Sequence, residues 1–96
     1  MPIPNPARGE VNVPLAGTPR RLCLTLGALA RIEAALALDD WSQLPDRFAR
    51  LSATDLTAVL AALLEGGGED PEVLTAQPVT IPEAVAAVTA ALAACA

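Results

Sequence analysis

The most constraining feature of the chain is a change in hydrophobic spacing near Thr25. Before it, residues 20–24 alternate between polar or small side chains and leucine, which is the two-residue period of a strand with one buried face. After it, the apolar residues recur at helical spacing, at Leu29, Ile32 and Leu36. We therefore expect a strand that leads directly into a helix, with Thr25 as the N-cap residue.

A second strand precedes this one. Residues 10–15 (EVNVPL) also alternate, and the turn-forming residues Ala-Gly-Thr-Pro separate them from residues 20–24. The pattern predicts an antiparallel β-hairpin over residues 10–24. Pro14 has no backbone N–H to donate, which favours an edge position for its strand.

The clearest helix follows Ser52. Its apolar residues recur at i, i+3, i+4, i+7 and i+8, at Leu56, Val59, Leu60, Leu63 and Leu64. Either Ser52 or Thr54 can cap the helix, and Ser52-x-x-Asp55 resembles a capping box. Residues 66–68 are all glycine and are predicted to end it, because glycine adopts the left-handed conformation at low cost.

The remaining helices are less regular. The first helix should run from Thr25 to about residue 38, with Ala28 and Ala35 beside its apolar face. A turn at 41–44 should lead into a short helix from Pro45, and one further helical turn should start at Pro71. The last helix begins at a Thr80-x-x-Glu83 capping box, and one of its faces carries Val85, Val88, Leu92 and Cys95. The predicted fold class is α+β but mostly α: an N-terminal β-hairpin followed by a small bundle of three main helices and one short helix.

Length and proline placement indicate the domain organisation. A chain of 96 residues supports one modest core. Three prolines within residues 1–9 exclude a helix or central strand, so this segment is predicted to be an extended arm. Residues 10–96 are predicted to form a single hairpin-plus-helical-bundle domain. Cys23 and Cys95 are too few for a disulfide framework, and we expect them to be buried thiols.

The composition removes most catalytic side chains. The chain contains no His, Lys or Tyr, so a Ser or Cys nucleophile would have no histidine partner. We therefore expect no enzymatic activity, no catalytic residue and no cofactor. The acidic residues Glu69, Asp70 and Glu72 lack the ligand spacing of a calcium loop, and we expect a solvated loop there rather than a metal site.

Charge and hydropathy limit the kind of partner. The net charge is −5, and the 6 basic residues are all arginine, which argues against nucleic-acid binding. The longest apolar stretch, residues 84–96, is shorter than the roughly 20 residues that a bilayer requires, so we expect no membrane span. Arg20 and Arg21 beside the hairpin turn could contact an acidic partner, or they could form a solvated edge that discourages strand addition.

Several short motifs follow one another in a fixed order. They are Gly9-Glu10-Val11, Arg21-Leu22-x-Leu24-Thr25, Gly27-Ala28-Leu29, Glu33, Phe48, Ser52-x-x-Asp55-Leu56, Leu60 and Gly66-Gly67-Gly68. In this order they resemble the small tail-assembly chaperones that are encoded in gene transfer agents and related siphophage-like prophages of α-proteobacteria. The resemblance covers about residues 8–75.

The resemblance implies a function in tail morphogenesis. Such proteins are thought to bind the long, apolar, helical tape-measure protein before the tail tube polymerises around it. We therefore expect the tape-measure protein as partner, the tail-tube protein as a second partner, a cytoplasmic location in the bacterial host and absence from the mature particle. The candidate partner-binding residues are Arg20, Arg21, Val85, Val88 and Leu92. Because more than half of the residues are hydrophobic, we also expect self-association as a homo-oligomer.

Two alternatives remain open at this point: a minor structural tail protein and a generic helical adaptor. A tail-tube subunit fits less well, since it needs a long β-sandwich to stack in rings and this chain has room for one hairpin.

Overall fold

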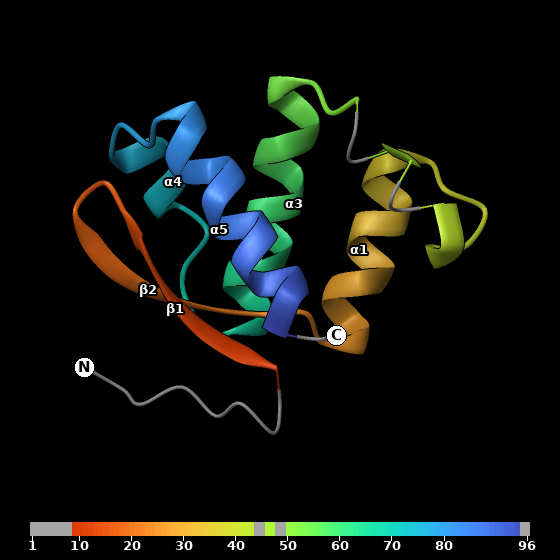
Figure 1. Ribbon diagram of the computed structural model, residues 1–96, viewed down its shortest axis with the longest axis horizontal. Coiled ribbons are helices and arrows are strands. Elements are labelled where there is room, and N and C mark those ends of the chain that lie inside the picture. The colour runs from red at the N-terminus through yellow and green to blue at the C-terminus, as the bar shows by residue number, and fades with distance from the viewer. Residues whose placement is uncertain (1–8, 44–45, 48–49, 95–96) are drawn as a thin grey trace.

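The computed structural model describes residues 9–43, 46–47 and 50–94, and these form a β-hairpin followed by helices (Figure 1). The elements are β1 (Glu10–Leu15), β2 (Thr18–Cys23), α1 (Leu26–Leu36), the 3-10 helix η2 (Trp41–Gln43), α3 (Ala53–Gly66), α4 (Val73–Ala76) and α5 (Ile81–Ala94). The predicted fold class is confirmed. The predictions for the arm before Gly9, for Pro45, for Phe48 and for Cys95 fall outside the described residues.

The hairpin closes through a two-residue loop. Its strands pair antiparallel, with Leu15 opposite Thr18, and the loop residues Ala16 and Gly17 have φ angles of 53° and 82°. Two consecutive positive φ angles give the loop a backbone twist that matches the right-handed twist of the two paired strands. The N–H of Ala16 also donates to Oε1 of Glu83 over 3.4 Å, which ties the turn to the start of α5.

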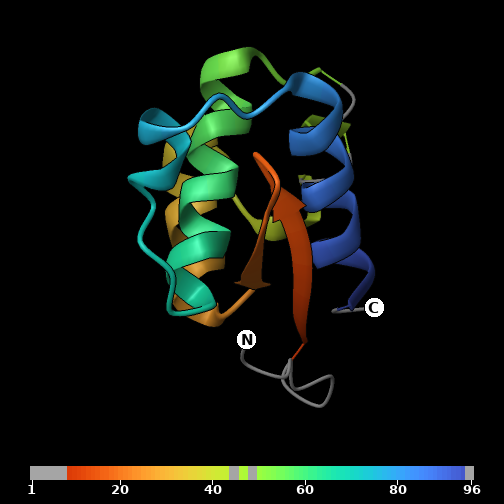
Figure 2. The ribbon, with the colours of Figure 1, turned by 90° about the vertical axis from the view of Figure 1, so that its left-hand side faces the viewer.

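The hairpin lies between α3 and α5 (Figure 2). α5 packs along β1, α3 packs along β2, and α1 contacts α3 (Figure 1). Buried apolar side chains from both strands and three helices form the core: Val13, Leu15, Leu22, Ala28, Ile32, Leu36, Val59, Leu60, Ala62, Leu63, Leu64, Ala84, Ala87, Val88 and Ala91. Cys23 is also buried.

The first helix begins where the change of spacing predicts. The hydroxyl of Thr25 accepts a hydrogen bond from the N–H of Ala28 over 3.0 Å, so Thr25 is the N-cap residue. The helix ends at Leu36, two residues earlier than predicted, because Ala37 adopts a left-handed conformation with a φ of 55°. Its inner face is Ala28, Ile32 and Leu36, whereas Ala35, predicted beside that face, is exposed.

The second main helix confirms the predicted capping box. The hydroxyl of Ser52 accepts from the N–H of Asp55 over 3.1 Å, and the Asp55 carboxylate accepts from the N–H of Ser52 over 3.4 Å. Four of the five predicted apolar residues are buried, and Leu56 is half-buried. The predicted box at Thr80 and Glu83 is also present at the start of α5.

The three glycines at the end of α3 have different functions. Gly68 is left-handed, with a φ of 81°, and the N–H groups of Gly68 and Glu69 bond back to carbonyls of the last helical turn, as in a Schellman motif. Gly66 and Gly67 are not left-handed. A Cβ on Gly66 would overlap the carbonyl oxygen of Cys23, and one on Gly67 would overlap that of Arg21. The prediction that all three supply a left-handed stop was therefore wrong for these two, which instead allow β2 to approach.

The face that α5 buries consists mainly of alanines. Its buried residues are Ala84, Ala87, Val88 and Ala91, whereas Val85 is 50% exposed. Small side chains let the helix lie close to the hairpin, and the larger residues are left at the side. The predicted shared face of Val85, Val88 and Leu92 is present, since all three line one hollow, but the prediction overlooked the alanines that pack on the hairpin.

We expect Gly67→Ala to lower the free energy of unfolding by about 1–3 kcal/mol, because the added methyl group would force β2 away from α3. Gly27→Ala is the control. Gly27 is helical, and a Cβ there would meet only the hydroxyl oxygen of Thr25 at an ordinary contact distance of 3.9 Å, so this change should stabilise the protein by about 0.5–1 kcal/mol. Urea unfolding followed by circular dichroism measures both, and equal effects would contradict the close approach.

Leu60→Ala should lower the free energy of unfolding by about 2–5 kcal/mol, because Leu60 is only 2% exposed in the core between α3 and its neighbours. Leu26→Ala removes the same atoms from a side chain that is 83% exposed and should change stability by no more than about 0.5 kcal/mol. Thermal melts of the two variants make the comparison. An unchanged melting temperature for Leu60→Ala would mean that this face of α3 is open to solvent.

Candidate functional site

The predicted partner-binding residues separate into two places. Arg20 and Arg21 lie on β2 and contact the loop that follows α3. The N–H of Arg21 donates to Oε2 of Glu69 over 3.0 Å, and its Nε donates to the carbonyl of Gly67 over 2.7 Å. Arg20 forms an ion pair with Glu69 at 3.6 Å. These contacts attach β2 to the end of α3, and partner binding by either arginine stays a prediction.

The acidic loop takes part in the same attachment. Glu69 binds β2, and the carboxylate of Asp70 accepts from the N–H of Glu72 over 2.9 Å in the turn before α4. The loop therefore has a structural use for two of its three acids.

Before α3, the hydroxyl and the N–H of Ser42 donate hydrogen bonds to the carboxylate of Asp40. These bonds lower the pKa of the Asp40 carboxyl group.

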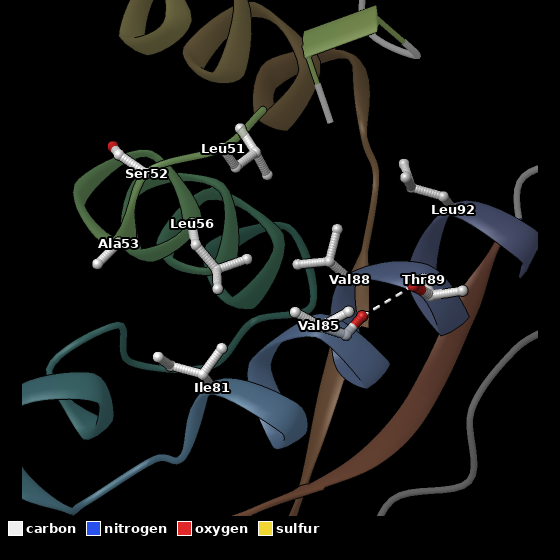
Figure 3. Close-up of a pocket in the computed structure, with 9 residues that line it drawn as sticks. All are labelled: Leu51, Ser52, Ala53, Leu56, Ile81, Val85, Val88, Thr89 and Leu92. Carbon is white, nitrogen blue, oxygen red and sulfur yellow. Dashed lines mark hydrogen bonds between the residues drawn. The ribbon is translucent and has the colours of Figure 1, made fainter. Parts of the chain in front are cut away.

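The other three predicted residues lie together in an apolar groove, shown in Figure 3. Val85, Val88 and Leu92 form one wall, along α5, and the start of α3 supplies the opposite wall. The complete lining is Leu51, Ser52, Ala53, Leu56, Ile81, Val85, Val88, Thr89 and Leu92, and the groove has a volume of about 330 Å³. We call this surface the α3–α5 groove.

The α3–α5 groove is open to solvent. Ile81 is 68% exposed and Val85 is 50% exposed, while Val88 is buried and forms the floor. Two of the three large hydrophobic side chains that stand out as exposed in the described chain thus belong to this groove. Single exposed apolar residues are ordinary, but adjacent ones around a hollow indicate an interaction surface.

The chemistry of the α3–α5 groove is neutral and apolar. None of its lining residues carries a charge. Its two polar side chains already make hydrogen bonds: the hydroxyl of Ser52 accepts from Asp55, and that of Thr89 donates to the carbonyl of Val85 over 2.8 Å (Figure 3). The groove therefore presents mainly carbon to a partner, and it holds no group suited to acid–base chemistry.

Sequence reasoning missed Leu51 and Leu56 on the α3 side of the groove and Ile81 on its α5 side. Leu56 was assigned to the core stripe of its helix, and Ile81 was hidden between the capping residue Thr80 and a proline. The alanines at 84, 87 and 91 recur at helical spacing, but those at 86, 90 and 93 recur in the same way on the less buried side, so the sequence did not reveal which alanine face packs on the hairpin. Because the alanines at 84, 87 and 91 pack inward, Ile81 and Val85 are left exposed at the edge of the groove.

Fold and groove together define a small hairpin-and-helix protein with an open apolar groove between two of its helices. A family model described as phage tail tube protein, GTA-gp10, matches residues 8–95. Because this match spans most of the chain, the protein belongs to that phage and gene-transfer-agent tail family. Searches of curated proteins and of solved structures gave no match. No helix in the described part of the chain is both long and apolar enough to cross a membrane.

The contacts of Glu69 can be tested by removal. Glu69→Ala leaves the N–H of Arg21 without its acceptor in a half-buried place, which should lower the free energy of unfolding by about 1–3 kcal/mol. Glu72→Ala removes an exposed acid from the same loop and should change stability by no more than about 0.5 kcal/mol. Urea denaturation distinguishes them, and equally small losses would show that Glu69 does not hold the loop to β2.

Proposed function

We propose that this protein is a tail-assembly chaperone that binds the tape-measure protein during tail morphogenesis. Membership of a phage and gene-transfer-agent tail family supports a function in tail formation. The observation that carries the proposal is the α3–α5 groove, an open and uncharged hollow bordered by Ile81 and Val85. An apolar, helical partner is the kind of molecule that such a surface can cover.

The family description names a tail-tube protein, which favours a structural role as the second candidate. A tube subunit that stacks in rings needs a long β-sandwich. Within the residues that the structure describes, the sheet has two strands, β1 and β2. This architecture supports the chaperone more than the tube subunit, and a minor tail subunit is the structural role that would fit the fold.

The proposed action is binding without catalysis. The groove contains no titratable side chain, and the chain has neither His nor Lys to act as a base near neutral pH. The chaperone would act in the bacterial cytoplasm while the tape-measure protein is exposed, and it would leave before the particle is complete. The tail-tube protein is the second proposed partner, because under this proposal it would replace the chaperone on the tape-measure protein.

Co-expression with the tape-measure protein of the same gene cluster tests this proposal. Affinity capture of the present chain should bring down soluble tape-measure protein, because a covered apolar helix is kept from aggregating. Expression of the tape-measure protein without the chain is the control, and it should give mostly insoluble material.

Mass spectrometry of purified particles separates the two candidates. A chaperone should be absent from finished particles or present only in traces. Stoichiometric amounts of this chain in particles, together with failure to capture the tape-measure protein, would replace the chaperone with the structural tail protein.

A further inference from the structure

The wall that α5 contributes to the α3–α5 groove is a stripe along the helix axis. Ile81, Val85, Val88 and Leu92 stand at i, i+4, i+7 and i+11, which is one side of the helix over three turns. At 1.5 Å per residue the stripe is about 16 Å long. A site of this shape fits an elongated object lying beside the helix rather than a compact small molecule.

The hollow continues beyond Ile81. A second, smaller space of about 160 Å³ shares Ala53, Leu56 and Ile81 with the groove and is bordered further on by Leu74 and Val79. The apolar lining thus extends from α5 to the segment between α4 and α5. Ile81 lines both spaces, and its side chain is 68% exposed.

Two acidic side chains near the groove are already engaged in other contacts. The carboxylate of Glu83, the one acid on α5, accepts hydrogen bonds from the N–H groups of Ala16 and Thr80. At the start of α3, Asp55 forms an ion pair with Arg47 at 3.1 Å. A partner that matches this surface must therefore be neutral on the side that it buries, because an unpaired charge placed there would lose its hydration without compensation.

The volume sets the size of the partner's side chains. A cavity of about 150 Å³ lined by aliphatic residues is large enough to hold a benzene molecule. The space of about 330 Å³ therefore holds about two large apolar side chains, whereas alanines would leave much of it empty. A helix can supply such side chains from successive turns, which is a common way of filling an apolar groove.

We propose that the α3–α5 groove binds one helix of the partner, laid along α5 for about three turns, through two large uncharged side chains such as Leu, Phe or Met that stand one helical turn apart, at i and i+4. This inference rests on the proposed function and assigns the tape-measure protein's contact to a particular surface. Ile81 and Val85 form the outer edge of the contact, and Val88 forms its floor.

Site-specific photo-crosslinking in the co-expressed complex tests the location. A benzophenone amino acid replaces Thr89, which lines the groove, or Ala86, which is exposed on α5 outside the lining. We expect crosslinks to the tape-measure protein from position 89 at a yield at least about tenfold above that from position 86. The crosslinked peptide should lie in a helical segment that carries large apolar residues at the stated spacing.

Paired charge substitutions test the chemistry. Val85→Asp should reduce the captured tape-measure protein by about tenfold or more, because the new carboxylate is desolvated in the contact. Ala86→Asp adds the same charge to the same helix and should change capture by less than about twofold. Capture by the unmodified chain should persist in 1 M salt, where the screening length is only about 3 Å. Circular dichroism checks that both variants are folded.

The outcomes distinguish the inference from the function on which it rests. Capture of the tape-measure protein with equal crosslinking from positions 86 and 89, or with equal sensitivity to both charges, overturns the assigned groove and leaves the chaperone function intact. Crosslinks from position 89 to a second copy of this chain would make the groove a self-association surface and would also overturn the inference. No capture by the unmodified chain removes the proposed function and the inference together.

Discussion

The last turn of α3 rests directly on the backbone of β2, and the rest of the fold depends on this contact. It is possible because Gly66 and Gly67 place no Cβ between the two backbones. Arg21 and Glu69 then join the same segments through hydrogen bonds beside the contact. A two-stranded hairpin has little stability in water by itself, so its position follows from what covers it: α3 on β2 and α5 on β1.

The groove is a consequence of how α5 meets the hairpin. Helices at a protein surface usually bury their large apolar residues and expose polar ones. α5 instead buries three alanines together with Val88 and leaves Ile81 and Val85 at the side. Because no charged residue follows Glu83 on this helix, the uncovered side stays apolar. The alanines that let α5 lie close to the sheet thus also leave its larger side chains at the edge of the groove.

The size of the groove is consistent with a contact that must be released. About three turns of one helix would fill it, so a single site can cover only a short segment of a long partner. A neutral, apolar contact forms without matched charges and needs no covalent step to separate. Under the proposed function, these properties suit a protein that protects an apolar helix until the tail tube replaces it.

Much of the local structure follows from the sequence alone. The capping residues Thr25, Ser52 and Thr80 and the apolar face of α3 follow from spacings of three or four residues, and the hairpin follows from two alternating segments joined by a short turn, so their signals are visible along the chain. The sequence also determined the absence of the usual catalytic bases.

Tertiary structure decided the features that require knowing which segments are neighbours. No residue near Gly67 in the sequence indicates that β2 lies against it, because its contact in β2, Arg21, is 46 residues away in the chain. Likewise, Leu51 and Ile81 become walls of one groove only because α3 and α5 pack side by side. Hydrophobic spacing identifies which residues leave water, but the partner that each helix face meets is set by close packing among all the elements, and that packing turned the alanines of α5 inward and left its larger side chains open.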